Sequence, residues 1–380
     1  MEGADVVPIG PDETKVAAWG VTANDQPHTP IWIPRGKCGP DDVRFELLFC
    51  GICHSDVHIG GNDFGYTRYP FVAGHELCGR VVEVGANVQK VKVGDPVGVG
   101  CIVDSCQDCA RCNEGEEQYC QKAMTGTYNG KRIHGHVPGN QALQTFGGYS
   151  AENVVHQRYI FKIHENIPLE TAGPIFCAGI TMYDPLRYHG ATSGKKMKIG
   201  IVGIGGLGTM GIKLAAALGH DVIAISTSPH KEQMAKEKGA THFCVSTDPE
   251  SCKQFAGQMD LIINTVSGGF DINTYLPLLK KDGVFNQCGA TLEPIKFKNM
   301  QVIFGRRRLT GSKIGGCPAT EELIELCGKH KIFPDVQVIE ANQIDWAWKQ
   351  LSGAGGAANK DGVRYVIDIK KSLQSDFVPK

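Results

Sequence analysis

The chain has 380 residues, an apolar content of 42%, a charged content of 21% and a formal net charge of −1. This length allows two or three domains with a large core, and the balanced charge argues against nucleic acid or an anionic membrane as the main partner. No stretch reaches the ~18 apolar residues of a membrane span, and the N-terminal MEGADVVPIG lacks the features of a signal peptide, so we expect a cytoplasmic protein.

The first half of the chain is rich in strand-like runs. Up to about residue 175, short runs rich in β-forming residues are separated by Gly, Pro and Asp. The clearest runs are DDVRFELLFC, GRVVEVG, DPVGVGCIV and AENVVHQRYIFKI. This pattern predicts an irregular, mainly antiparallel β domain.

Three side chains in this half are candidate ligands of a catalytic metal. The motif CGICHSDVH contains Cys53, the motif GHE contains His75, and the motif PIFCAGIT contains Cys177. A catalytic zinc takes about three protein ligands and keeps one position open for substrate, and two cysteines with one histidine are a known set. The three residues are far apart in the sequence, so the spacing alone does not prove a site, and His75 with its neighbours could instead be ordinary polar residues.

A dense cysteine cluster, CQDCARCNEGEEQYC, occupies residues 106–120. A disulfide framework is not expected in a chain without a secretory signal. A redox motif needs two cysteines at the start of a helix, whereas this stretch has four in a loop. The spacing is compatible with a closed four-thiolate zinc site, and it leaves an iron–sulfur cluster open.

The other cysteines give a weaker signal. With fifteen cysteines and no secretory signal, the chain is expected to hold reduced thiols and metal ligands. Nine of them are scattered, often beside apolar residues, and are interpreted as small core side chains. These are Cys38, Cys50, Cys78, Cys101, Cys244, Cys252, Cys288, Cys317 and Cys327.

The sequence pattern changes near Pro174, and from Lys196 strand-like and helix-like runs alternate. KMKIGIVGI, HDVIAIST, HFCVS, MDLIINTV and GVFNQCG are apolar strand candidates, and helical patterns such as LGTMGIKLAAALG lie between them. Such alternation predicts a parallel sheet with helices on both faces. After Gly316 come one amphipathic helix and further β-type runs. We therefore expect an α/β domain, 178–315, inserted into a β domain formed by 1–177 and 316–380.

The first strand of this α/β part leads into GIGGLG, which opens a helix and therefore predicts a dinucleotide site. Gly203 permits a tight turn, Gly205 lets the backbone approach a pyrophosphate, and Gly208 lets helix and strand pack closely. The helix N-terminus adds N–H groups and partial positive charge. The candidate residues are Gly203, Ile204, Gly205, Gly206, Leu207 and Gly208.

The second strand indicates which dinucleotide is bound. It ends in STSPHK, without the acidic residue that binds the ribose 2′-hydroxyl of NAD. Ser226, Thr227 and Ser228 offer hydroxyls and Lys231 offers a cation, all suited to a 2′-phosphate. The same residues could simply cap the next helix. The pattern favours NADP(H).

These motifs together resemble a known family, the zinc-dependent medium-chain dehydrogenases, and within it the cinnamyl alcohol dehydrogenase-like NADPH-dependent aldehyde reductases. The resemblance runs from about Val16 to Ile369. It rests on GICHSDVH, YPFVAGHELCGRVVEVG, VKVGDPVGVG, the four-cysteine segment, MTGTYNG, FGGYS, CAGITMY, GIGGLG and LTGSKIGG in this order. It implies a Rossmann doubly wound parallel sheet inserted in a GroES-like, mainly β catalytic domain.

The resemblance also implies roles for individual residues. Cys53, His75 and Cys177 match the catalytic zinc ligands, and Glu76 matches a glutamate that can ligate the same zinc. Asp56 matches an acid that orients the histidine ligand. Ser55 and His58 match the members of a proton relay. The positions that match the nicotinamide end of the cofactor groove are Thr181, Thr265, Gly289, Ser312, Lys313 and Ile314. The ligands of a structural zinc, in a lobe at 101–122, are Cys106, Cys109, Cys112 and Cys120.

The implied activity is reversible hydride transfer between NADP(H) and a primary alcohol or aldehyde, with broad or aromatic specificity. Two zinc ions per chain, a small-molecule substrate and a homodimer follow from the same resemblance, whereas nucleic acid and membrane partners do not. An iminium or enone reductase on the same fold is one alternative. A non-enzymatic, cofactor-binding structural protein is the other.

Overall fold

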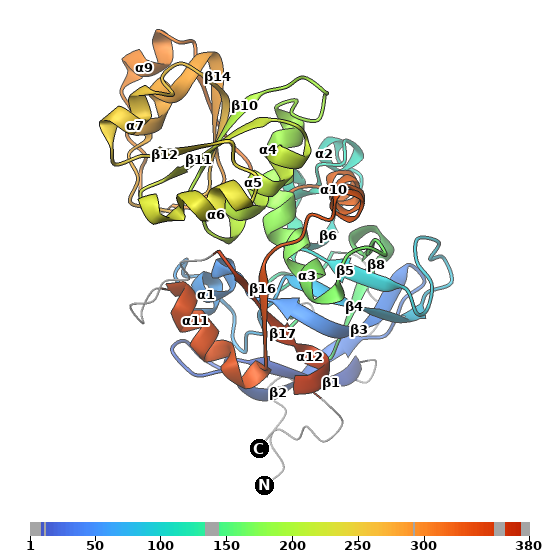
Figure 1. Cartoon of the computed structure of the whole chain (residues 1–380). Coiled ribbons are helices and arrows are strands. Elements are labelled where there is room, and N and C mark those ends of the chain that lie inside the picture. The colour runs from blue at the N-terminus through green and yellow to red at the C-terminus, as the bar shows by residue number, and fades with distance from the viewer. Residues whose placement is uncertain (1–8, 11–12, 134–143, 292, 353–361, 374–380) are drawn as a thin grey trace. The chain divides into compact units, whose positions relative to one another are not determined.

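A computed structural model describes residues 9–10, 13–133, 144–291, 293–352 and 362–373. The chain divides into two compact units, residues 1–177 with 316–380 and residues 178–315 (Figure 1). In the part of the chain that the structure describes, no helix is long and apolar enough to cross a membrane.

The first unit is built on a mainly antiparallel sheet. Its strands follow the order β16-β17-β3-β4-β5-β9, and β8 also pairs with β3. The strands are β3 (Asp42–Gly51), β4 (Glu76–Val84), β5 (Pro96–Val99), β8 (Glu152–His156), β9 (Phe161–Lys162), β16 (Val336–Ile339) and β17 (Arg364–Asp368). Because β17 pairs antiparallel with β3, residues after 316 complete a sheet that begins with residue 42.

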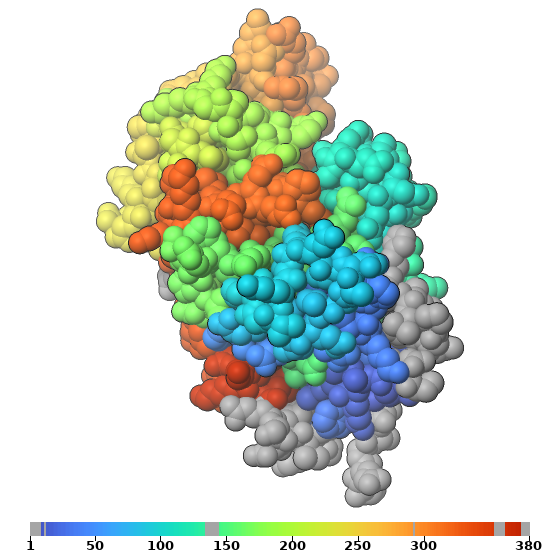
Figure 2. Space-filling view, turned by 90° about the vertical axis from the view of Figure 1, so that its right-hand side faces the viewer, coloured from blue at the N-terminus to red at the C-terminus, as the bar shows by residue number. Residues whose placement is uncertain are grey.

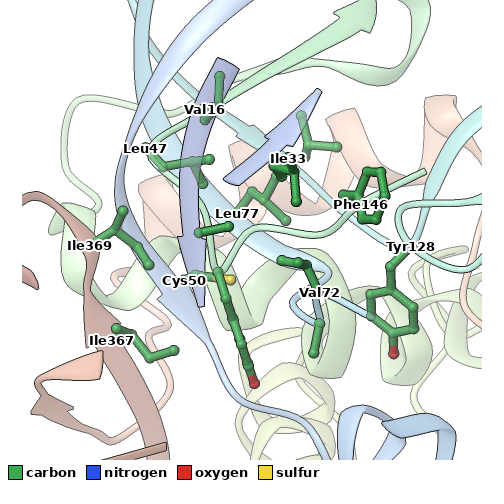
Figure 3. Close-up of a cluster of buried hydrophobic side chains, with 14 of the residues drawn as sticks. Val16, Ile33, Leu47, Cys50, Val72, Leu77, Tyr128, Phe146, Ile367 and Ile369 are labelled. Atoms are coloured by element: carbon green, nitrogen blue, oxygen red, sulfur yellow. The ribbon is translucent and has the colours of Figure 1, made fainter. Parts of the chain in front are cut away.

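Two smaller strand pairs accompany this sheet. The hairpin β1 (Glu13–Gly20) and β2 (Thr29–Gly36) is antiparallel, and so is the pair β6 (Ile102–Ser105) and β7 (Met124–Gly126). Val16 and Ile33 from the hairpin belong to the same buried cluster as Leu47 and Leu77 from the sheet (Figure 3). Full burial of each such side chain contributes roughly 1.5–3 kcal/mol of hydrophobic free energy.

Helices of four to fourteen residues connect the strands of the first unit. The α-helices are α1 (His54–Gly60), α2 (Ala110–Asn113), α3 (Leu169–Pro174), α10 (Cys317–His330), α11 (Ile344–Ser352) and α12 (Ile369–Ser372). Three 3-10 turns are η1 (Glu117–Tyr119), η2 (Gln157–Tyr159) and η6 (Ala341–Gln343). The chain passes from the first unit to the second through a π-helical turn, η3 (Ile175–Gly179).

The second unit contains one six-stranded sheet in the order β12-β11-β10-β13-β14-β15, and every neighbouring pair in it is parallel. Its strands are β10 (Lys198–Val202), β11 (Asp221–Ser226), β12 (His242–Val245), β13 (Met259–Asn264), β14 (Leu279–Gln287) and β15 (Arg308–Gly311). This is the doubly wound strand order 3-2-1-4-5-6. The central strands β10 and β13 are largely apolar and buried, as expected where both faces of a sheet are covered.

The connecting helices of the second unit are short. They are α4 (Ile180–Tyr188), α5 (Gly206–Ala217), α6 (Glu232–Glu237), α7 (Pro249–Lys253), α8 (Ile272–Tyr275) and α9 (Asn299–Ile303), with the 3-10 turns η4 (Pro229–Lys231) and η5 (Leu276–Leu278). The strand order reverses between β10 and β13, so the carboxyl end of β10 is the topological switch point, where such sheets bind ligands.

Candidate active site

Four buried side chains of the first unit converge on one point: Cys53, His75, Glu76 and Cys177. One potential ligand atom from each lies within 4.8 Å of the others. The Sγ atom of Cys177 is 3.7 Å from the Sγ atom of Cys53 and 3.1 Å from Nε2 of His75. Thiolates and a neutral imidazole at these separations suit a tetrahedral zinc ion.

Local backbone structure places each of these ligands. Cys53 lies two residues after the end of β3 and is the N-cap of α1, with extended dihedral angles. His75 follows Gly74, whose φ of 99° lies in the left-handed region that favours glycine. Cys177 sits in the π-helical turn η3, an arrangement that is frequent at functional sites. The cluster thus combines three separate segments of the chain.

The carboxylate of Asp56 orients the histidine. Its Oδ1 atom lies 3.0 Å from Nδ1 of His75, and its Oδ2 atom accepts a hydrogen bond of 2.8 Å from the backbone N–H of Cys53. A proton on Nδ1 that is donated to Asp56 leaves the lone pair of Nε2 directed at the cluster. This is the arrangement in which histidine binds a metal.

Glu76 is fully buried beside these ligands. Burial raises the pKa of Glu76 to about 7, although Arg364, 3.3 Å away, opposes the shift. Neither carboxylate oxygen has a hydrogen-bond partner among the described residues. A buried carboxylate with unsatisfied oxygens costs free energy, and a cation in the cluster would remove that cost. This observation supports a metal at this position.

Two further polar side chains lie on α1. Ser55 is exposed, and its hydroxyl is 3.8 Å from Sγ of Cys53. His58 follows almost one turn later, and its Nδ1 lies 2.6 Å from Oδ2 of Asp63. The ring of His54 stacks on that of His58, with centroids 4.7 Å apart. Ser55 is therefore the hydroxyl group that stands beside the cluster and faces solvent.

The four cysteines of residues 106–120 form a second cluster, whose sulfur atoms all lie within 4.8 Å of one another. The Cys106–Cys112 and Cys109–Cys112 sulfur distances are 3.9 and 3.5 Å. Zn–S bonds of about 2.3 Å in a tetrahedron separate the sulfurs by about 3.8 Å. The backbone N–H of Gln121 donates to Cys109 and lowers the pKa of that thiol to about 6.

This cysteine lobe contacts the start of α10. The carboxylate of Glu117 accepts a hydrogen bond of 2.9 Å from the backbone N–H of Cys317 and pairs with Arg158 at 2.7 Å. Figure 2 shows the lobe (teal) beside the orange residues of α10. A site closed by four thiolates has no position for substrate, so this cluster is suited to a structural metal.

The glycine loop of the second unit links β10 to α5. Gly203 has φ of 86°, and a Cβ atom on Gly208 would lie 1.8 Å from the carbonyl oxygen of Gly203. A Cβ atom on Gly205, in contrast, would meet nothing within 4 Å. Strand and helix therefore touch at Gly208, whereas the backbone at Gly205 is open to a ligand at the N-terminus of α5.

The segment after β11 lies next to this loop. The Nζ atom of Lys231 donates a hydrogen bond of 2.8 Å to the carbonyl oxygen of Ile204. The hydroxyl of Ser226 is buried and accepts a hydrogen bond of 3.1 Å from the N–H of Ser228, whereas Thr227 is exposed. A cation and hydroxyl groups thus lie after β11, at the position where an acidic residue would select NAD(H).

Of the residues expected at the nicotinamide end, Thr181 lies on α4 and the others lie on the turns after β13, β14 and β15. The hydroxyl of Thr265 donates to the carbonyl oxygen of Val202 at 2.8 Å. Cys288 lies 3.5 Å from the hydroxyl of Ser312 and 3.8 Å from the carbonyl oxygen of Thr181. The remaining expected positions are Gly289, which closely approaches Val266, the exposed Lys313, and Ile314 with φ of 42°.

Comparison with known proteins decides the family. Residues 39–165 match the model of the alcohol dehydrogenase GroES-like domain, and residues 206–329 match that of the zinc-binding dehydrogenases. This chain belongs to the zinc-binding alcohol dehydrogenase family. The predicted fold class and the oxidoreductase class are thereby confirmed, and the alternative of a non-enzymatic structural protein is wrong.

Individual relatives of this dehydrogenase match over nearly their whole length. A probable mannitol dehydrogenase from Medicago sativa is 42% identical over 96% of this chain and 98% of its own. NADP-dependent alcohol dehydrogenase C 1 from Mycolicibacterium smegmatis is 42% identical over 95% and 99%. The structure of a cinnamyl alcohol dehydrogenase from Sorghum bicolor aligns with a TM-score of 0.87 and 35% identity over 95% and 100%.

The structure adds residues to the dehydrogenase site that sequence reasoning did not place there. Cys101, interpreted as a packing residue, hydrogen-bonds with Cys177, and this contact lowers the pKa of Cys101 to about 6 despite burial. The hydroxyl of Tyr128 lies 3.0 Å from Nδ1 of His75. Tyr128 belongs to the MTGTYNG motif, so the resemblance could have singled it out, whereas nothing local marks Cys101 or Arg364.

Proposed function

We propose that this dehydrogenase interconverts aldehydes and primary alcohols with NADP(H), using a zinc ion held by Cys53, His75 and Cys177. The observation that carries the proposal is the buried two-cysteine, one-histidine cluster with an oriented histidine. Glu76 is proposed as a further ligand of the same ion. Cys106, Cys109, Cys112 and Cys120 are proposed to hold a second, structural zinc.

The chemistry needs polarisation of the substrate oxygen and a hydride donor. When bound, the zinc ion supplies a Lewis acid and the dinucleotide supplies the hydride. Ser55 can donate a proton to the substrate oxygen and accept one in return, because a hydroxyl is both donor and acceptor. His58, on the same face of α1 and hydrogen-bonded to Asp63, can pass that proton to solvent.

The loop after β11 supports NADP(H) as the cofactor. Ser226, Thr227, Ser228 and Lys231 are proposed to hold the 2′-phosphate, and the pyrophosphate would lie over the open backbone at Gly205. An NADP-dependent relative with 42% identity supports the same assignment. We propose the second unit, 178–315, as the cofactor domain and the first, 1–177 with 316–380, as the catalytic domain.

Exposed aromatic rings close to His58 support aromatic aldehydes among the substrates. The rings of Phe64 and Tyr66 stack with centroids 6.0 Å apart, and Phe64 is 6.0 Å from His58. Side-chain stacking on a planar substrate would stabilise its binding. The relatives include proteins named for mannitol and for cinnamyl alcohol, which supports both aliphatic and aromatic compounds as substrates.

A turnover assay tests the proposal. We expect NADPH oxidation with aliphatic and aromatic aldehydes, strongest with aromatic ones, and loss of activity after treatment with a strong chelator. Oxidation driven by enones or cyclic iminium ions, with no turnover of any aldehyde, would instead assign the enzyme to those reductases. No turnover of any of these compounds by a preparation containing two zinc ions per chain would refute the proposal.

We also propose a homodimer formed through the second unit. β15 is the last strand of the sheet. On this strand and in the segment that precedes it, the exposed apolar side chains are Ile295, Phe297, Met300, Ile303, Phe304 and Leu309. Such a patch beside an edge strand indicates an interface with another copy. Phe304 is 79% exposed. The variant Phe304→Asp should therefore be a monomer when its mass is measured by light scattering. A variant of unchanged mass would count against this interface.

A cytoplasmic location is the last part of the proposal. All fifteen cysteines lie in the described part of the chain, and none of them forms a disulfide. A protein rich in reduced thiols is typical of a reducing compartment. Cell fractionation with an antibody against the chain tests this assignment, and recovery in a secreted fraction would contradict it.

A further inference from the structure

The carboxylate of Asp56 is the centre of a buried hydrogen-bond network. Its Oδ2 atom accepts from the N–H of Cys53 at 2.8 Å and from the hydroxyl of Tyr149 at 3.2 Å. Its Oδ1 atom lies 3.0 Å from Nδ1 of His75 and accepts from the N–H of Gly74 at 3.3 Å. Asp56 and Tyr149 are both fully buried. Among these donors, only Tyr149 is a side chain from outside the segments that carry the cluster.

The hydroxyl of Tyr149 has a second neighbour, Trp348. The indole Nε1 atom of Trp348 lies 3.4 Å from this oxygen and donates to it. An indole N–H can only donate, so the oxygen of Tyr149 is the acceptor in this contact. Its single proton is then directed to Asp56. Burial raises the pKa of Tyr149, so the phenol keeps this proton at neutral pH.

The position of Trp348 is itself restrained by packing. A Cβ atom on Gly60 would lie 2.3 Å from the indole ring, so this ring occupies space that only a glycine leaves open. The imidazole of His28 meets the indole edge-on, with centroids 4.4 Å apart, and its Nδ1 atom lies 2.7 Å from Asp345. The indole N–H therefore has one orientation, which points at Tyr149.

We propose that Tyr149 and Trp348 are positioning residues that act through Asp56 on the ligand His75, and that they set how tightly the cluster of Cys53, His75 and Cys177 holds zinc. This inference rests on the proposed function, because it needs zinc at that cluster. The direction of the chain is Trp348 to Tyr149 to Asp56. Each link keeps the carboxylate turned so that His75 presents Nε2 to the metal.

The size of the effect follows from similar networks. Loss of a hydrogen-bonded partner of a histidine ligand lowers metal affinity by about 10- to 100-fold. Tyr149→Phe removes one of the donors to Asp56 and leaves the backbone donors in place. We therefore expect about a 10-fold faster loss of zinc from this cluster. Trp348→Phe leaves the hydroxyl of Tyr149 free to turn, so we expect a smaller acceleration of zinc loss from this variant.

The test follows release of zinc from the intact, zinc-loaded enzyme to an excess of a coloured chelator. The release phase that disappears in Cys177→Ser belongs to the catalytic cluster, and the other phase belongs to the four-cysteine lobe. Tyr149→Phe should accelerate only the first phase. Tyr275→Phe is the matched control, because it removes a buried tyrosine hydroxyl that hydrogen-bonds with Ser246, a residue outside the network.

The double variant separates positioning from general loosening. Because Trp348 acts through the hydroxyl of Tyr149, adding Trp348→Phe to Tyr149→Phe should not change zinc release further, even where it lowers the thermal unfolding temperature. If the two substitutions accelerated zinc release independently, so that their effects multiplied in the double variant, the role of Trp348 would be overturned. Release from Tyr149→Phe at the rate of Tyr275→Phe would overturn the whole inference. If Cys177→Ser removes no phase, the proposed zinc site itself is wrong, and the inference falls with it.

Discussion

The exposed Thr227 gives a direct test of cofactor selection. It is the first residue after β11, beside the glycine loop, and its neighbour Ser226 is buried. Replacing Thr227 with Asp places a carboxylate where we expect the 2′-phosphate of NADP(H), and where an acid would bind the ribose hydroxyls of NAD(H). The variant should have a lower kcat/KM for NADPH and a higher kcat/KM for NADH than the parent enzyme.

The magnitude follows from the charge and its exposure. Two unit charges 4 Å apart interact by about 4 kcal/mol near a protein surface. Because Thr227 is exposed, solvent and salt reduce this repulsion to roughly 1–2 kcal/mol. We therefore expect kcat/KM for NADPH to fall by about 5- to 30-fold, since each 1.4 kcal/mol is a factor of ten.

The assay measures kcat/KM for NADPH and for NADH at low and at high salt. Thr227→Asn is the control, because it has the shape of aspartate without the charge and should change the ratio of the two values little. The shift caused by aspartate should shrink as salt is added. A ratio of NADPH to NADH values equal to that of the asparagine variant would refute the placement of the 2′-phosphate beside Thr227.

Three further perturbations test other parts of the molecule. Ser55→Ala should lower kcat by about 100-fold, as for a lost proton-transfer partner; an unchanged kcat, with a full isotope effect from deuterated NADPH, would contradict the relay. Cys112→Ser should remove one of two zinc ions by elemental analysis and lower the thermal unfolding temperature, because a structural zinc contributes folding free energy. Partial burial opposes ionisation of Asp345, but contacts with His28 hold its pKa below the ordinary value. The free energy that this ionised form contributes is present above the ordinary pKa and is lost as pH falls through the lowered one. Urea unfolding of Asp345→Asn should accordingly show a shallower loss of stability below about pH 4 than the parent chain, and parallel curves would show that the ion pair contributes nothing.

The sequence carried much of the fold because many of its signals are local. The alternating apolar strands and helices from Lys196 onward predict a parallel sheet, and the structure has six parallel strands there. GIGGLG predicts its own turn, since a positive φ at Gly203 and close packing at Gly208 depend on neighbouring residues. The four cysteines that the sequence groups within residues 106–120 likewise have their sulfur atoms close together in the structure.

Other features have no local signature. The hairpin of β1 and β2 and the edge strand β15 are absent from the runs that the sequence singles out, because strand formation depends on pairing and packing partners as well as on a strand's own residues. Cys101 carries the same signal as any cysteine beside apolar residues. Its contact with Cys177 arises only when β5 and η3 pack together.

By itself, the sequence determined the β-rich and the alternating parts of the chain, the turns built by glycine and the chemistry available in each motif, because these depend on a few consecutive residues. Only the tertiary structure decided which distant side chains meet. Cys53 and Cys177 are 124 positions apart, and Tyr149 and Trp348 are 199 apart. Contacts of this kind require the whole sheet to form, since burial and hydrogen bonding across such separations exist only once the intervening chain has folded.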